Sequence, residues 1–157
     1  MLRTVRRRHR MTCNPNNYPE ESIVTRTADQ RGAVLIVDDD PTILTILYHY
    51  LSYAGFSVHT VQDGRRAINQ AELVRPDVIL LDVIMPGADG FSLAQQLRTC
   101  ETTQTTPIIF MTGVVDIETR LQSLQLEQVD FMSKPVDLPD VLARVTKYMA
   151  GYQAPGQ

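Results

Sequence analysis

The fold of this chain is decided by the stretch Ala33-Val34-Leu35-Ile36-Val37-Asp38-Asp39-Asp40-Pro41, in which five apolar residues end abruptly in three aspartates. A continuous apolar run, rather than an alternating one, is typical of a strand buried on both faces, as in a parallel sheet. Asp40 is a favourable helix cap and Pro41 suits a first helical turn, so a helix should follow directly. The stretch therefore predicts a strand with an acidic end, leading into a helix.

The same strand-then-helix pattern recurs along the rest of the chain. Further strands are predicted at Phe56–Val61, Val78–Leu81, Pro107–Met111 and Val129–Met132, and the first of these alternates as an edge strand does. Helices are predicted over residues 41–54, 63–74, 91–98, 116–124 and 138–149, with residues 85–90 as a loop. Five strands alternating with five helices predict the α/β class with a doubly wound, five-stranded parallel sheet.

Polar side chains fall at the carboxyl ends of four of these strands. They are Asp38, Asp39, Asp82, Thr112 and Lys134. Ligands of open α/β sheets bind beyond the carboxyl ends of the strands, so one site lined by these residues is expected. Carboxylates without His or Cys suit Mg²⁺, and a lysine and a hydroxyl could neutralise a phosphoryl group. The set therefore fits phosphoryl transfer to a carboxylate.

Charge divides the chain into two parts. Residues 1–31 hold seven arginines against three acidic residues, whereas residues 32–157 hold eight basic and fifteen acidic side chains. The first part, rich in Asn and Pro after its arginines, is expected to be a disordered basic extension; a start at Met11 or an arm for an acidic partner are the alternatives. The acidic body argues against direct DNA binding, because phosphates would be repelled.

Location follows from what the chain does not contain. No apolar run reaches the roughly 18 residues of a membrane span, and the basic start lacks the apolar segment of a secretory signal. The two cysteines, Cys13 and Cys100, form neither a CxxC motif nor a disulfide framework. A reducing, cytoplasmic location is therefore expected.

Four motifs together resemble the receiver domain of two-component response regulators. They are Val37-Asp38-Asp39-Asp40, Leu81-Asp82-Val83-Ile84-Met85-Pro86-Gly87-Ala88-Asp89-Gly90, Met111-Thr112-Gly113 and Ser133-Lys134-Pro135. Their order and their spacing are both as the family has them. The resemblance covers residues 32–150, which leaves 1–31 as the extension and 151–157 as a short flexible tail. It implies a flavodoxin-like sheet with strand order 2-1-3-4-5.

The resemblance also implies a role for each site residue. Asp82 resembles the phosphoacceptor, and Thr112 and Lys134 the hydroxyl and the lysine that contact the phosphoryl group. Mg²⁺ would be held by Asp38, Asp39, Asp82 and the backbone carbonyl of Ile84. Thr112 and Phe131 fall at the switch positions, where Phe131 can act only by packing.

These roles imply partners as well. The phosphoryl donor would be a sensor histidine kinase or a histidine phosphotransfer protein. A downstream target would bind the face made by the fourth helix, the fifth strand and the fifth helix. Only eight residues follow Met149, so a stand-alone receiver is expected, one that catalyses nothing beyond its own phosphorylation and dephosphorylation.

Two other interpretations remain open at the level of sequence. Asp38 and Asp40, followed by Thr42, fit the DxDxT nucleophile motif of haloacid-dehalogenase-type phosphatases, although that motif leaves Asp82 and its loop unexplained. Alternatively, the chain is a pseudo-receiver that binds partners without being phosphorylated.

Overall fold

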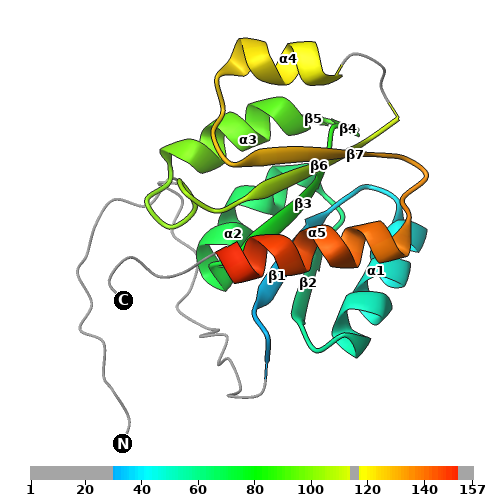
Figure 1. Cartoon of the computed structure of the whole chain (residues 1–157). Helices are drawn as coiled ribbons and strands as arrows, with labels where there is room; N and C mark the ends of the chain where they lie inside the picture. The colour runs from blue at the N-terminus through cyan, green and yellow to red at the C-terminus, as the bar shows by residue number, and fades with distance from the viewer. Residues whose placement is uncertain (1–29, 114–116, 152–157) are drawn as a thin grey trace, which may run out of the picture.

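A five-stranded parallel sheet forms the centre of the computed structural model, which describes residues 30–113 and 117–151 (Figure 1). Its strands are β1 (Ala33–Val37), β2 (Ser57–Val61), β3 (Val78–Asp82), β6 (Ile108–Thr112) and β7 (Val129–Ser133). They lie in the order β2-β1-β3-β6-β7, and every neighbouring pair is parallel. This is the predicted order 2-1-3-4-5, so the flavodoxin-like fold is confirmed, with β2 at an edge.

Helices cover both faces of the sheet. They are α1 (Pro41–Tyr53), α2 (Ala67–Val74), α3 (Gly90–Thr99), α4 (Ile117–Leu124) and α5 (Leu138–Gly151). Residues of α1 and α5 share one buried cluster with the sheet, and residues of α2 and α3 share the other. The chain therefore winds to both sides of the sheet, as the sequence predicts.

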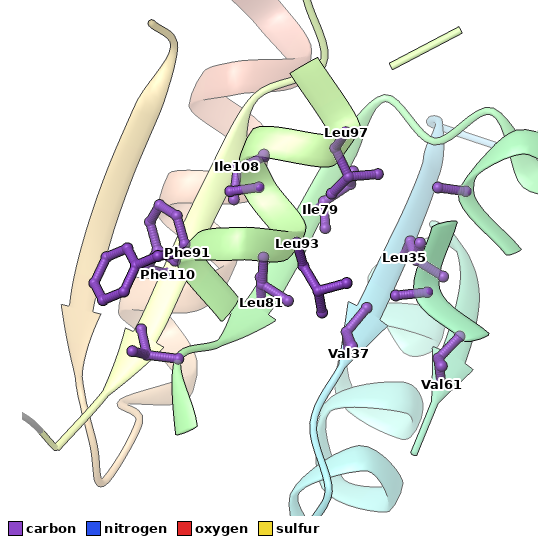
Figure 2. Packing of buried hydrophobic residues seen from close by; sticks show 14 of the residues in the cluster. Leu35, Val37, Val61, Ile79, Leu81, Phe91, Leu93, Leu97, Ile108 and Phe110 are labelled. Atoms are coloured by element: carbon purple, nitrogen blue, oxygen red, sulfur yellow. The ribbon is translucent and has the colours of Figure 1, made fainter. Parts of the chain in front are cut away.

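The central strand β1 shows why its sequence is apolar without interruption. Leu35 and Val37 point into the cluster beneath α2 and α3, whereas Val34 and Ile36 point into the cluster beneath α1 and α5. Figure 2 shows the first cluster, in which Phe91 of α3 and Phe110 of β6 lie with ring centroids 5.2 Å apart. Because successive side chains of a strand alternate between faces, a strand buried on both sides needs an apolar residue at each position.

Two predicted elements differ in detail. The helix expected over residues 63–74 begins as a 3₁₀ turn, η1 (Gly64–Arg66), because Asp63 accepts a hydrogen bond from the amide of Arg65 and tightens the first turn. The loop expected over residues 85–90 contains a short antiparallel pair, β4 (Ile84–Met85) and β5 (Ala88–Asp89).

The remaining expectations concern the ends of the chain. The extension, apart from its last two residues, and the tail, apart from Gly151, lie outside the described residues. None of the helices in the described part of the chain is long and apolar enough to cross a membrane.

Candidate functional site

Three carboxylates gather at the carboxyl edge of the sheet. Asp38 follows β1 and is fully buried, Asp39 is half-buried, and Asp82 is the last residue of β3 with 4% of its surface exposed. One carboxylate oxygen from each lies within 4.8 Å of the others. The parallel register that places the end of β1 beside the end of β3 brings these residues together, although they are distant in sequence.

Lys134 provides the positive charge at this cluster. Its Nζ lies 2.8 Å from Oδ2 of Asp38 and 3.3 Å from Oδ1 of Asp82. The backbone fixes its position, because the amide of Lys134 donates to the carbonyl of Thr112 at 2.8 Å where β7 leaves the sheet. Lys134 therefore bridges the ends of two strands that do not pair with β7.

The charges of this cluster alter its titration. Burial, followed by the charge of Asp38, raises the pKa of Asp82 to about 6, against the opposing effect of Lys134. Burial lowers the pKa of Lys134, but its hydrogen bond and charge interaction with Asp38, helped by Asp82, outweigh burial and raise it. At neutral pH the site therefore holds an ionised lysine and a mostly ionised Asp82.

Thr112 and Phe131 lie on the strands expected, β6 and β7. Thr112 ends β6, which pairs with β3, and only 4% of its surface is exposed. Phe131 is half-buried on β7, opposite Phe110 of β6, and packs against the cluster shown in Figure 2. The roles of Thr112 and Phe131 as switch residues require a conformational change, so these roles remain predictions.

Ile84 contributes through its backbone. Its amide donates to Oδ1 of Asp82 at 3.4 Å, while its side chain is 65% exposed. The Ile84 amide therefore lies beside the Asp82 carboxylate. The Ile84 carbonyl belongs to the next peptide group, and its use as a metal ligand remains a prediction.

The donor set fits a hard divalent cation. All three side chains offer carboxylate oxygens, and no His or Cys of the described residues joins the cluster. Mg²⁺ prefers oxygen ligands and keeps several waters, so a partly open cluster of this kind suits it. A cavity of about 640 Å³ adjoins the cluster at Asp39 and is lined also by Arg65, Arg66 and Pro86, so solvent can reach the cluster at Asp39.

Asp40 does not join the cluster. It is exposed, and its Oδ1 accepts a hydrogen bond from the amide of Thr42 at 2.8 Å, which caps α1. The Asp40 amide in turn donates to Oδ1 of Asp38 at 2.9 Å. A phosphatase mechanism would need the side chain of Asp40 beside that of Asp38, so this geometry favours the set centred on Asp82.

Gly90 lies in one of the four motifs, but the sequence alone predicts no role for it beyond its place in a loop. A Cβ atom here would lie 2.8 Å from Cα of Val83 and would collide with the carbonyl oxygen of Asp82. The amide of Gly90 also donates to the carbonyl of Val83 at 2.9 Å. The first turn of α3 thus packs directly against the backbone of Asp82. The Asp89-Gly90 pair, a capping residue followed by glycine, was the available signal.

Comparisons with known proteins agree with this site. Residues 34–146 match the response regulator receiver domain family. The chain is 36% identical over 112 residues to the DNA-binding dual master transcriptional regulator RpaA of Synechocystis sp., a match covering 71% of this chain and 46% of the relative. It is 34% identical over 124 residues to the DNA-binding transcriptional regulator NtrC of Klebsiella pneumoniae, covering 79% and 26%. The chain spans about half or less of the length of these relatives.

Solved structures match over nearly their whole length. The signal receiver domain of a signal transduction histidine kinase from Syntrophus aciditrophicus is 32% identical, with a TM-score of 0.70, over 80% of this chain and 96% of that one. The receiver domain of the sensor histidine kinase PA1611 from Pseudomonas aeruginosa, which has a magnesium ion in its active-site cleft, is 29% identical. Its TM-score is 0.67 over 76% of this chain and 98% of that one.

Proposed function

The chain belongs to the response regulator receiver domain family, and from this premise we propose that Asp82 accepts a phosphoryl group in a Mg²⁺-dependent reaction. The donor is the phosphohistidine of a sensor histidine kinase or of a histidine phosphotransfer protein. The phosphorylated chain then signals by contact with a target protein. The reaction takes place in the cytoplasm, and the chain catalyses only its own phosphorylation and dephosphorylation.

The position of Lys134 is the observation that carries this proposal. A structural lysine would be satisfied by one carboxylate, but Nζ of Lys134 lies between Asp38 and Asp82. A cation held beside an acceptor carboxylate can follow the charge as it moves from the carboxylate to a bound phosphoryl group. Asp38 keeps this cation in place whether or not Asp82 is modified.

Phosphoryl transfer to Asp82 requires little more of the chain than the positioning of the reacting groups and the neutralisation of their charge. The phosphorus–nitrogen bond of the donor breaks, a phosphorus–oxygen bond to Asp82 forms, and the imidazole keeps the electron pair and takes up a proton. Asp82 must be ionised to attack, and a pKa of about 6 leaves it mostly ionised at pH 7. Asp38, Asp39, Asp82 and the Ile84 carbonyl would hold Mg²⁺, which would neutralise the transferring oxygens.

Thr112 and Lys134 would then receive the product. Both lie at strand ends beside Asp82, and a phosphoryl group there adds about −1.5 to −2 units of charge. Movement of Thr112 toward these oxygens and repacking of Phe131 would change the face made by α4, β7 and α5. We infer that the target protein binds this face.

The first test is the intact mass of the protein after incubation with acetyl phosphate and Mg²⁺. The wild type should gain one phosphoryl group, and Asp82→Asn should gain none. Asp40→Asn is the matched control, because Asp40 follows the acidic pair directly but lies outside the cluster. It should be phosphorylated like the wild type, and omission of Mg²⁺ should abolish the gain in both.

Other results separate the alternatives. An adduct that persists in Asp82→Asn but disappears in Asp38→Asn would identify a phosphatase nucleophile at Asp38. A folded wild type that binds Mg²⁺ but gains no mass, from acetyl phosphate or from a phosphorylated histidine phosphotransfer domain, would identify a pseudo-receiver.

A further inference from the structure

Helix α1 is exposed to solvent but carries no charge. Among its thirteen residues there is no Asp, Glu, Lys or Arg, whereas each of the other four α-helices has at least one. Three of the five large apolar side chains that are exposed in the described part of the chain lie on it, at Ile46, Tyr48 and Tyr53. Protein interfaces are depleted in charged residues and enriched in tyrosine, so this helix has the composition of an interface.

The exposed residues form a regular seam. Thr42, Ile46, His49 and Tyr53 are all exposed and are separated by four, three and four positions. This is the spacing of one contact stripe between packed helices. The buried residues Leu44, Leu47 and Leu51 occupy the opposite side of α1 and pack on the sheet. In Figure 1, α1 lies at the edge of the molecule, which leaves the seam accessible.

The order of residues along this seam makes it complementary to itself. In an antiparallel pair of seams centred between Ile46 and His49, Thr42 of one helix lies opposite Tyr53 of the other. Ile46 then lies opposite His49. The smallest side chain of the seam, Thr42, thus faces the largest, Tyr53, and the two-fold axis brings no like charges together because the seam holds no Asp, Glu, Lys or Arg. We propose that the seam of α1 is the contact surface for a second copy of this chain, related by a two-fold axis.

The residues at the ends of the helix support the same arrangement. Asp40 caps the N-terminus of α1 and is exposed. Arg31 lies at the C-terminal end, where its guanidinium is 3.4 Å from the carbonyl oxygen of Ala54. Antiparallel pairing therefore brings Asp40 of each copy toward Arg31 of the other, and it also opposes the two helix dipoles. These paired charges select the antiparallel orientation over the parallel one.

One helix face is a small contact area, so the dimer should dissociate in the micromolar range. Its mass would be twice the 17.7 kDa of the chain. The test is sedimentation velocity of the full-length protein across a concentration series, with an acidic variant and a basic variant. The acidic variant carries Ile46→Glu and His49→Glu, and the basic variant carries Ile46→Lys and His49→Lys.

Each variant alone should be monomeric at every concentration, because the two-fold axis sets its new charges against the same charges. An equimolar mixture of the two should regain the mass of a dimer, which also shows that both variants fold. Leu73→Glu on α2 is the control, since Leu73 is 54% exposed but lies away from the seam, and it should dimerise like the wild type.

Three results would overturn the proposal. They are a wild type that stays monomeric throughout the series, a dimer that survives in both charge variants, and a mixture of variants that does not re-form the dimer. The second result would assign dimerisation to another surface.

Discussion

Gly90 sets how closely α3 approaches Asp82. A Cβ at this position would meet the backbone of Asp82 and Val83, and backbone cannot move aside as the end of a flexible side chain can. We expect Gly90→Ala to lower the free energy of unfolding by about 1 to 3 kcal/mol, the usual cost of overpacking. Urea unfolding measures this change.

A second glycine supplies the control for this prediction. Gly113 also lies beside the site, one residue after Thr112, but a Cβ there meets no atom within 4 Å. Gly113→Ala should therefore change the free energy of unfolding by less than about 0.5 kcal/mol. Equal effects of the two substitutions would show that the close approach at Gly90 has no energetic consequence.

At the scale of secondary-structure elements, one arginine joins α3 to the segments that lead into β6 and β7. The guanidinium of Arg98 donates to the carbonyl oxygens of Thr103, Thr106, Glu127 and Gln128 at 2.9 to 3.3 Å. Burial lowers its pKa, the effect being opposed by Glu127, which marks a partly desolvated cation. Arg98 thus supplies hydrogen-bond donors to the backbone carbonyl groups of two loops.

Removing this arginine should destabilise the protein more than its half-buried position suggests. Arg98→Met keeps the aliphatic stem but leaves up to four carbonyl groups without this donor, so we expect a loss of about 2 to 3 kcal/mol in the free energy of unfolding. Thermal and urea unfolding measure it. Arg66→Met is the control, because the Arg66 guanidinium interacts with Asp63 through charge and pairs no such set of backbone carbonyls among the described residues. A loss no larger than that of the control would contradict the prediction.

The elements that the sequence predicts well are those with a strong local pattern. The five strands follow from apolar runs, because a strand buried on both faces has no alternative composition. Their order follows from the resemblance, and it brings Asp38, Asp82 and Lys134 together. The pair β4–β5 and the turn η1 were missed because each spans only two or three residues, too few for a periodic pattern.

Two contributions could not be predicted for a different reason. Arg98 acts on backbone carbonyls up to thirty residues away, and nothing in the sequence marks which carbonyls need a donor. Gly90 is needed because of a contact between two backbone segments, which depends on the packed positions of α3 and β3. Both effects are tertiary, so they become visible only once the fold is assembled.

At the scale of the whole molecule, the acidic site limits the stability of the metal-free protein. The pKa of Asp82 is raised from 3.8 to about 6 by folding, chiefly through burial, so between these values the folded state binds more protons than the unfolded state. The free energy of unfolding must therefore fall as the pH rises through this window. A divalent cation that binds only the folded state should restore this lost stability, because it raises the free energy of unfolding.

Asp82→Asn should consequently stabilise the metal-free protein at neutral pH. Without a buried carboxylate to ionise, the variant should exceed the wild type in free energy of unfolding by about 3 kcal/mol at pH 7, and the difference should vanish as the pH falls from 6 to about 4. Urea unfolding in a chelating buffer across this range measures it. Excess Mg²⁺ should raise the free energy of unfolding of the wild type more than that of the variant.

Asp63 is a carboxylate of the same molecule whose pKa is shifted in the opposite direction from that of Asp82. Its pKa is lowered by the side-chain hydrogen bond from Arg65, so Asp63→Asn should lower stability at neutral pH and have no effect below the pKa of the folded state. If Asp82→Asn also lowered stability at pH 7, or kept its advantage at pH 4, burial of the Asp82 carboxylate would not be what opposes folding. If the two variants change stability in opposite directions as expected, the rest of the fold holds the Asp82 carboxylate in place at a cost in stability.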